Sequence, residues 1–362
     1  MKKIMHKKIF EVALITAALC LAAGCATPTK TATKTYYFFP PPPDEPHLQY
    51  LVGFSSEKAF GGGQKKGLMS FLTGVQPVNR GFGKPYGAAA HGKMLYVCDT
   101  DAHAVFVVDL QVKRIGILNT PGAGAPSLPL NIAIDTDGTC YIADSGREQV
   151  VIIDKNGNYA GALGKSGEMR PRDVAVNRDR LYVADMQLRG VRVYDKTSRK
   201  LLFNIPQETD KANTDRGIFM PTNLALDSEG RVYVADTGGS RVQVYDAEGK
   251  YLRTVGGVGD SPGRFARLKG VAVDRDNRLY TVDALSAVIQ IFNEQGRPLT
   301  WFGDPEASSP LQCLPAKVLV DYDDVALFQN YVAPDFKVEY LVFVINQIGY
   351  QMVSVYGFGH QK

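Results

Sequence analysis

Aspartates end a series of short apolar runs, and their number makes them the first candidates for chemistry. They stand at positions 99, 144, 185, 236 and 283, each at the end of a run such as Tyr233-Val-Ala-Asp236. Five carboxylates brought together would form a ring that binds cations. The alternative is that each caps backbone amides of the turn that follows it, a frequent role of aspartate. We favour capping, because a ring of uncompensated acids is costly to hold together.

Other residues with catalytic potential are sparse. Beyond position 25 the histidines are His47, His91, His103 and His360, whereas a catalytic zinc usually takes three protein ligands from one site. The glycines at 61–63 and the lysines at 65 and 66 lack the spacing of a phosphate-binding loop. No nucleophile elbow or dinucleotide motif occurs. We therefore expect no cofactor, and binding is favoured over catalysis.

Three cysteines remain once the N-terminal region is set aside. Cys98, Cys140 and Cys313 have no C-x-x-C spacing, which excludes a zinc ribbon or a covalent haem site. In an oxidising compartment one disulfide among the three is allowed but not required.

The N-terminus reads as an export signal. Four lysines precede an apolar run whose uninterrupted part, residues 12–23, is shorter than the roughly 20 residues of a spanning helix. The junction Ala22-Ala23-Gly24-Cys25 resembles a bacterial lipobox, which implies cleavage after residue 24 and lipidation of Cys25. Ala26 in place of aspartate implies outer-membrane sorting in the cell envelope. The alternative is an ordinary signal peptide with Cys25 incidental.

Cleavage at this junction would change the charge balance. The whole chain has a net charge of +4, from 41 basic and 37 acidic residues. Removing the four lysines and one glutamate of residues 1–24 leaves 37 basic and 36 acidic residues, a net charge of +1. Such a chain has no overall field to attract nucleic acid, so we expect no nucleic-acid partner.

Residues 25–46 are predicted to be a lipidated Thr- and Pro-rich tether. The segment from Ala26 to Thr35 has no hydrophobic period, and Pro40–Pro43 should add a short stiff stretch. The aromatic cluster Tyr36–Phe39 is either a docking epitope or part of the following domain, and we favour packing against the domain. The domain itself is predicted over 47–362.

The elements that position the aspartates form a repeat. A first apolar strand, such as Val174-Ala-Val-Asn177, is followed by a second ending in aspartate and by a third, such as Val242-Gln-Val-Tyr-Asp246. The second strands end at residues 99, 144, 185, 236, 283 and 346, with Asn346 in the last. Spacings of 41 to 63 residues suit four-stranded blades. The sequence predicts an all-β, six-bladed β-propeller.

The best unit, Pro221 to Gly257, resembles the NHL repeat family. It contains Pro-x-x-Leu-Ala-Leu-Asp, Tyr-Val-Ala-Asp and Arg-Val-Gln-Val-Tyr-Asp, although Gly239-Ser240-Arg241 replaces the usual Asn-His-Arg. The last unit ends after three strands, and the segment Leu48–Phe54 resembles the missing outer strand. Pairing between the two would complete the last blade, close the ring and remove two exposed edges, giving a monomeric propeller.

The resemblance implies that first strands line a central channel and that the residues just before them sit near one mouth. The predicted ligand-binding residues there are Asn131, Asp173, Asn223, Lys317, Arg172 and Lys269. We expect these polar side chains to be more exposed than the apolar residues that follow them, and able to grip a ligand or a partner loop. The alternative is that the charges merely neutralise one another.

Three long insertions offer further binding surface, at residues 55–84, 207–220 and 304–317. Together these features predict a cell-envelope lipoprotein that binds a protein or polymer partner through its loops and channel mouth. The alternative is a channel-site lyase or hydrolase that holds calcium between Asp173, Asn131 and Asn223.

Overall fold

A computed structural model describes residues 35–62, 80–120, 122–208, 213, 215–303 and 313–362. The chain divides into two units, and the described residues from Tyr36 to Lys362 belong to the second. Within them, no helix is long and apolar enough to cross a membrane. The predicted signal peptide, Cys25 and the first part of the tether lie outside the described residues.

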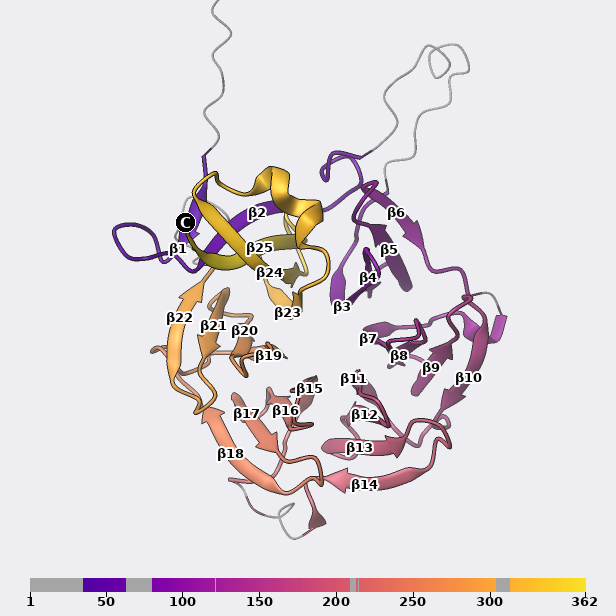
Figure 1. The fold of residues 1–362 in the computed structure, drawn as a ribbon. Helices are drawn as coiled ribbons and strands as arrows, with labels where there is room; N and C mark the ends of the chain where they lie inside the picture. The colour runs from indigo at the N-terminus through magenta and orange to yellow at the C-terminus, as the bar shows by residue number, and fades with distance from the viewer. Residues whose placement is uncertain (1–34, 63–79, 121, 209–212, 214, 304–312) are drawn as a thin grey trace, which may run out of the picture. The chain divides into compact units, whose positions relative to one another are not determined.

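Six antiparallel sheets surround a common axis, so the second unit is a six-bladed β-propeller, as predicted (Figure 1). The strands of the first three blades are β3 (Pro85–His91), β4 (Met94–Asp99), β5 (Ala104–Asp109), β6 (Arg114–Ile117), β7 (Pro129–Ile134), β8 (Cys140–Asp144), β9 (Gln149–Ile153), β10 (Tyr159–Leu163), β11 (Pro171–Val176), β12 (Arg180–Asp185), β13 (Gly190–Asp195) and β14 (Leu201–Ile205). The next two blades consist of β15 (Pro221–Leu226), β16 (Val232–Asp236), β17 (Arg241–Tyr245), β18 (Tyr251–Gly256), β19 (Leu268–Val273), β20 (Leu279–Asp283), β21 (Val288–Phe292) and β22 (Pro298–Phe302).

The sixth blade combines the two ends of the described chain. Its strands are β23 (Pro315–Asp321), β24 (Phe336–Asn346), β25 (Val353–Gln361), β2 (Leu48–Phe54) and β1 (Tyr37–Phe39). Strand β2 pairs with β25 from Leu48 opposite Phe358 to Phe54 opposite Val353. The ring is thereby closed by hydrogen bonds between segments about 300 residues apart in the sequence.

Strand β1 extends this sheet beyond the expected start of the propeller at residue 47. Tyr37 lies opposite Tyr50 in the register of β1 with β2, and Phe39 packs against Phe302 and Tyr356. The aromatic cluster therefore belongs to the domain, which begins near residue 36. A short 3-10 helix, Val325–Tyr331, lies between β23 and β24 and explains the long spacing of the last repeat.

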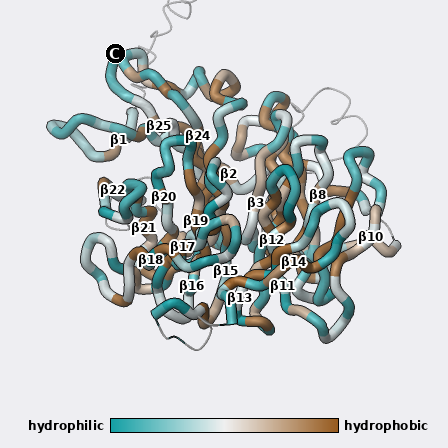
Figure 2. Tube along the Cα trace, turned by 60° about the horizontal axis from the view of Figure 1, so that its bottom comes forward, coloured by the Kyte–Doolittle hydropathy of each residue, from teal (hydrophilic) through white to brown (hydrophobic). Residues whose placement is uncertain are grey.

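The core lies between the blades. In β8, β16 and β20 every residue is buried, because both faces of a blade pack against neighbours. One cluster joins Val193 of the third blade to Leu224 and Val234 of the fourth. Figure 2 shows hydrophobic residues along the strands and hydrophilic ones in the connecting turns. Burial of each such Val or Leu contributes about 1.5–3 kcal/mol to the free energy of unfolding. Because these side chains pack between two blades, the stability of each blade depends on its neighbours.

Candidate functional site

The aspartates that end the second strands cap backbone amides, as expected. Asp144 accepts hydrogen bonds from Gly146 and Arg147 in the turn after it, and also from Ser127 and Leu128 in the connection before β7. The equivalent residues Asp99 and Asp283 do the same. Each buried carboxylate thus ties two loops together, which makes the series architectural.

All six inner strands contain a β-bulge at the same place. In β19, for example, the register shifts between Leu268 and Gly270, so Lys269 is the extra residue. The corresponding residues are Tyr86, Leu130, Arg172, Thr222, Lys269 and Ala316. Five of the six inner strands begin with a proline just before the bulge, and proline has no backbone N–H to donate to the neighbouring strand. The exception is β19, which begins with Leu268. Bulges re-aim side chains and are frequent next to functional sites.

One residue further along, the predicted mouth residues meet across the axis. The Lys317 Nζ atom from the sixth blade lies 3.2 Å from Oδ2 of Asp173 in the third and 3.0 Å from Oδ1 of Asn223 in the fourth. The same two oxygens accept the backbone N–H groups of Leu224 and Val271. Burial raises the pKa of Asp173, while the Lys317 ammonium and the backbone donors lower it. We call Lys317, Asp173 and Asn223 the channel plug.

The expected exposure of these residues is wrong. Asp173 is 0 % exposed and Asn223 1 %, no more than the apolar residues that follow them. Asn131 is 0 % exposed and donates from Nδ2 to the carbonyl of Arg172 over a long 3.5 Å. The sequence pattern predicts which face of a strand a side chain lies on, but it does not predict the diameter of the channel. This channel is narrow enough for the Lys317 side chain to reach from the sixth blade to the third. The charges of Lys317 and Asp173 neutralise each other, as the alternative interpretation of the mouth residues proposed.

The remaining cations form a second layer above the plug, which we call the cationic mouth. Lys269 in the fifth blade reaches Tyr86 of the first, with Nζ 3.4 Å from the hydroxyl and 5.3 Å from the ring centroid. Burial, followed by the charges of Arg267, Arg172 and Lys84, lowers the pKa of Lys269 to about 8. The charged groups of the described residues that act on Lys269 are thus cations, whereas Asp173 is paired with Lys317.

Some buried polar atoms at this level have no hydrogen-bond partner. In the described part of the chain they include Nε of Arg172, Nδ2 of Asn223 and Oδ1 of Asn131. Unpaired buried groups are rare and mark sites that take a ligand, an ion or water. The sequence could not reveal them, because they depend on contacts between three different blades.

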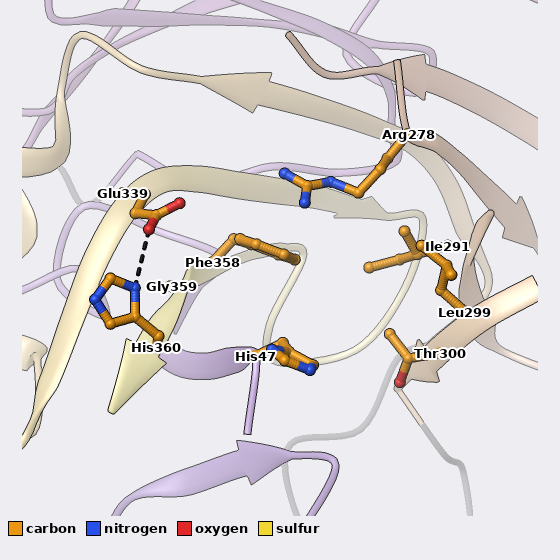
Figure 3. Close-up of a pocket in the computed structure, with 9 residues that line it drawn as sticks. All are labelled: His47, Arg278, Ile291, Leu299, Thr300, Glu339, Phe358, Gly359 and His360. Carbon is orange, nitrogen blue, oxygen red and sulfur yellow. Dashed lines mark hydrogen bonds and ion pairs between the residues drawn. The ribbon is translucent and has the colours of Figure 1, made fainter. Parts of the chain in front are cut away.

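Aside from the mouth, a cavity of about 440 Å³ opens at the seam between the fifth and sixth blades (Figure 3). Its wall is the Phe358 ring, which stacks on Tyr340 with centroids 4.7 Å apart and lies beneath the Arg278 guanidinium. His360 pairs with Glu339 at 2.9 Å on one side, and Arg278 is held by Asp274 at 2.6 Å. The charges here are paired internally, so the pocket presents an aromatic and aliphatic surface.

The histidines and cysteines do not gather. His360 and His47 share only this seam, and no group of three or more His, Cys, Asp or Glu residues among the described ranges could hold a metal ion. Cys98, Cys140 and Cys313 are free thiols. The disulfide that the sequence allowed is therefore not formed.

The ring has two faces, and each inner strand runs from one face to the other. Inner strands begin at one face, where the connections from the preceding blade arrive and where second strands turn into third strands. We call it the mouth face, because it carries the cationic mouth. The three long insertions all join an outer strand to the next inner strand, so their described ends lie on this face. A cavity of about 340 Å³ also lies here, with Arg264, Gln290 and Trp301 among its lining residues.

Comparison with known proteins agrees with the architecture. The model of the DUF5128 family, described as a 6-bladed beta-propeller, matches residues 205–299. Among solved structures, a gluconolactonase from Xanthomonas campestris is similar, with 16% identity, a TM-score of 0.55, and coverage of 76% of this chain and 86% of the other. A streptogramin B lyase has 10% identity and a TM-score of 0.51 over 77% and 85% of the two chains.

A further similar structure is a Bacteroides thetaiotaomicron protein of unknown function, with 15% identity, a TM-score of 0.53 and coverage of 76% and 70%. At such identities the likeness concerns the fold alone. The chain is a six-bladed β-propeller.

Proposed function

We propose that this protein is an NHL-type lipoprotein of the cell envelope that binds a protein or polymer partner through its mouth face. A lipid on Cys25 would anchor it, and residues from 26 to about 35 would tether the propeller to the membrane. The lipobox-like junction supports the anchor, and the distribution of exposed apolar side chains supports the binding face.

That distribution carries the proposal. Among the described connections between strands, six large hydrophobic side chains are well exposed on the mouth face, against Val112 on the opposite face. The six are Phe219, Met220, Val258, Leu285, Ile348 and Tyr350. Tyr350 is 94 % exposed and Val258 76 %. Exposed apolar groups gathered on one face and surrounding a polar centre are typical of an interaction surface.

The alternative, a calcium-dependent lyase or hydrolase in the channel, fits the residues poorly. The oxygens of Asp173 and Asn223 that would bind calcium already accept hydrogen bonds from the Lys317 ammonium and from backbone amides. An ammonium thus occupies the position that a channel cation would need. The described residues favour binding over catalysis.

Photo-crosslinking in the native host tests the proposal. A benzophenone amino acid at Leu285 or Tyr350 should give discrete adducts with a partner, because both side chains project from the mouth face. The matched control is Val112, 58 % exposed on the opposite face. Equal adducts from Val112, or none from the mouth face, would contradict the proposal.

A further inference from the structure

We propose that the cationic mouth binds an oxyanion, a carboxylate or phosphate group of the ligand, between Lys269 and Arg172 and above the channel plug. This inference deepens the proposed function, because it names the chemistry recognised at the centre of the mouth face and rests on that face being the binding surface.

The first support is geometric. Lys269 of the fifth blade reaches Tyr86 of the first, and the bulges in β19 and β11 make Lys269 and Arg172 the extra residues of their strands. Both side chains are half-buried, so part of each remains open to a ligand. The plug beneath them closes the channel, which gives the site a floor of zero net charge.

The second support is the balance of charge. Within the described ranges, the groups whose charges act on Lys269 are Arg267 beside it on the approach to β19, Arg172 of β11 and Lys84 before β3, and all are cations. Tyr86 is neutral at physiological pH, since burial raises its pKa. Asp173 is held by Lys317 in the layer below. An oxyanion would relieve this repulsion, whereas a cation would increase it.

Unpaired donors give the third support. The Nε atom of Arg172 and Nδ2 of Asn223 are buried N–H groups that find no acceptor among the described residues. A ligand that satisfies them must itself accept hydrogen bonds. Carboxylate and phosphate oxygens do so, and the planar guanidinium fork of arginine matches both groups.

Anion titration of the full-length protein in detergent tests the site. Binding of inorganic phosphate and of acetate is measured by calorimetry at constant ionic strength, and the stronger of the two identifies the source of the oxyanion. Lys269→Met and Arg172→Gln should each weaken binding about tenfold, the loss of one charge-assisted contact. Lys250→Met removes an exposed lysine from a turn on the opposite face and should leave binding unchanged.

A second readout does not depend on variants. Amine labelling followed by mass spectrometry should modify Lys269 faster than Lys250 at pH 7.5, and the better-binding anion should protect Lys269 alone. Absence of protection, or equal weakening by Lys250→Met, would overturn the proposal. Adducts from Leu285 and Tyr350 without any anion binding would refute the oxyanion site while leaving the binding face intact.

Discussion

At the scale of single residues, the plug pair is the unusual feature. Lys317 and Asp173 come from opposite blades, and their side chains are 9 % and 0 % exposed. Their attraction, together with two backbone N–H groups on Asp173, offsets part of the cost of removing both charges from water, and burial still leaves the pKa of Asp173 raised. A pair across the axis also fixes how the third and sixth blades face each other, which no contact between neighbouring blades can do.

Removing one member should therefore be costly. Lys317→Met leaves a buried carboxylate without its counter-ion, and we expect the free energy of unfolding in urea to fall by about 3–5 kcal/mol. The double variant Lys317→Met/Asp173→Asn should recover much of that loss. Glu339→Gln, which breaks the half-exposed pair with His360, serves as the control and should cost less than about 1 kcal/mol. A loss below about 1 kcal/mol for Lys317→Met would show that the pair is not a structural tie.

Lys269 makes anion binding depend on pH. Its ammonium is present below a pKa of about 8 and is lost above it. Sulfate affinity should thus fall between pH 7 and pH 9, by up to about tenfold, and sulfate keeps its own charge over this range. The raised pKa of the neighbouring Tyr86 keeps that hydroxyl neutral over the same range. In Lys269→Met the affinity should be low and flat with pH; an unchanged slope in that variant would assign the titration to another group.

At the scale of elements, repetition explains what could be predicted from the sequence. The run Tyr233-Val-Ala-Asp236 recurs in similar form because second strands pack between neighbouring blades. In five of the six blades the strand ends in an aspartate that accepts backbone hydrogen bonds from the connection before the inner strand. Strand β1 and the helix Val325–Tyr331 occur once and escaped prediction. The contact between Lys269 and Tyr86 also escaped, because it joins blades that are not neighbours and exists only in the closed ring.

Strand β2 should be indispensable, because it supplies the outer pairing edge of β25 and buries Leu48 and Phe54 completely. A chain starting at Ser56 would expose the edge of β25 and open the apolar seam between the sixth and first blades. We expect it to unfold or aggregate in size-exclusion chromatography and circular dichroism. The matched control starts at Tyr36 and keeps β1 and β2, so it should remain folded. A monomeric chain from Ser56 with a cooperative melt would show that β2 is dispensable.

At the scale of the whole molecule, one face of the ring combines two kinds of surface. The cationic mouth lies at its centre, and apolar side chains such as Val258, Leu285 and Tyr350 project from the surrounding connections. A partner with an acidic or phosphorylated group flanked by apolar surface would match both. The rigid ring holds these groups in place without help from a partner, so little ordering entropy would oppose binding.

The proposed lipid on Cys25 should determine whether the protein is found in the membrane fraction. Each buried CH₂ of an acyl chain contributes about 0.8 kcal/mol to membrane binding, and stable anchoring takes more than one chain, as diacylglycerol on Cys25 would provide. A near-neutral mature chain offers little electrostatic attraction to a membrane in its place. Cys25→Ala should therefore lose incorporated palmitate and move from the membrane to the soluble fraction, while its melting temperature and sulfate affinity stay those of wild type. The control Cys20→Ala lies within the predicted signal and should still yield lipidated, membrane-bound protein. Wild-type protein without labelled palmitate, or a Cys25→Ala protein that stays in the membrane fraction after a salt wash, would contradict the anchor.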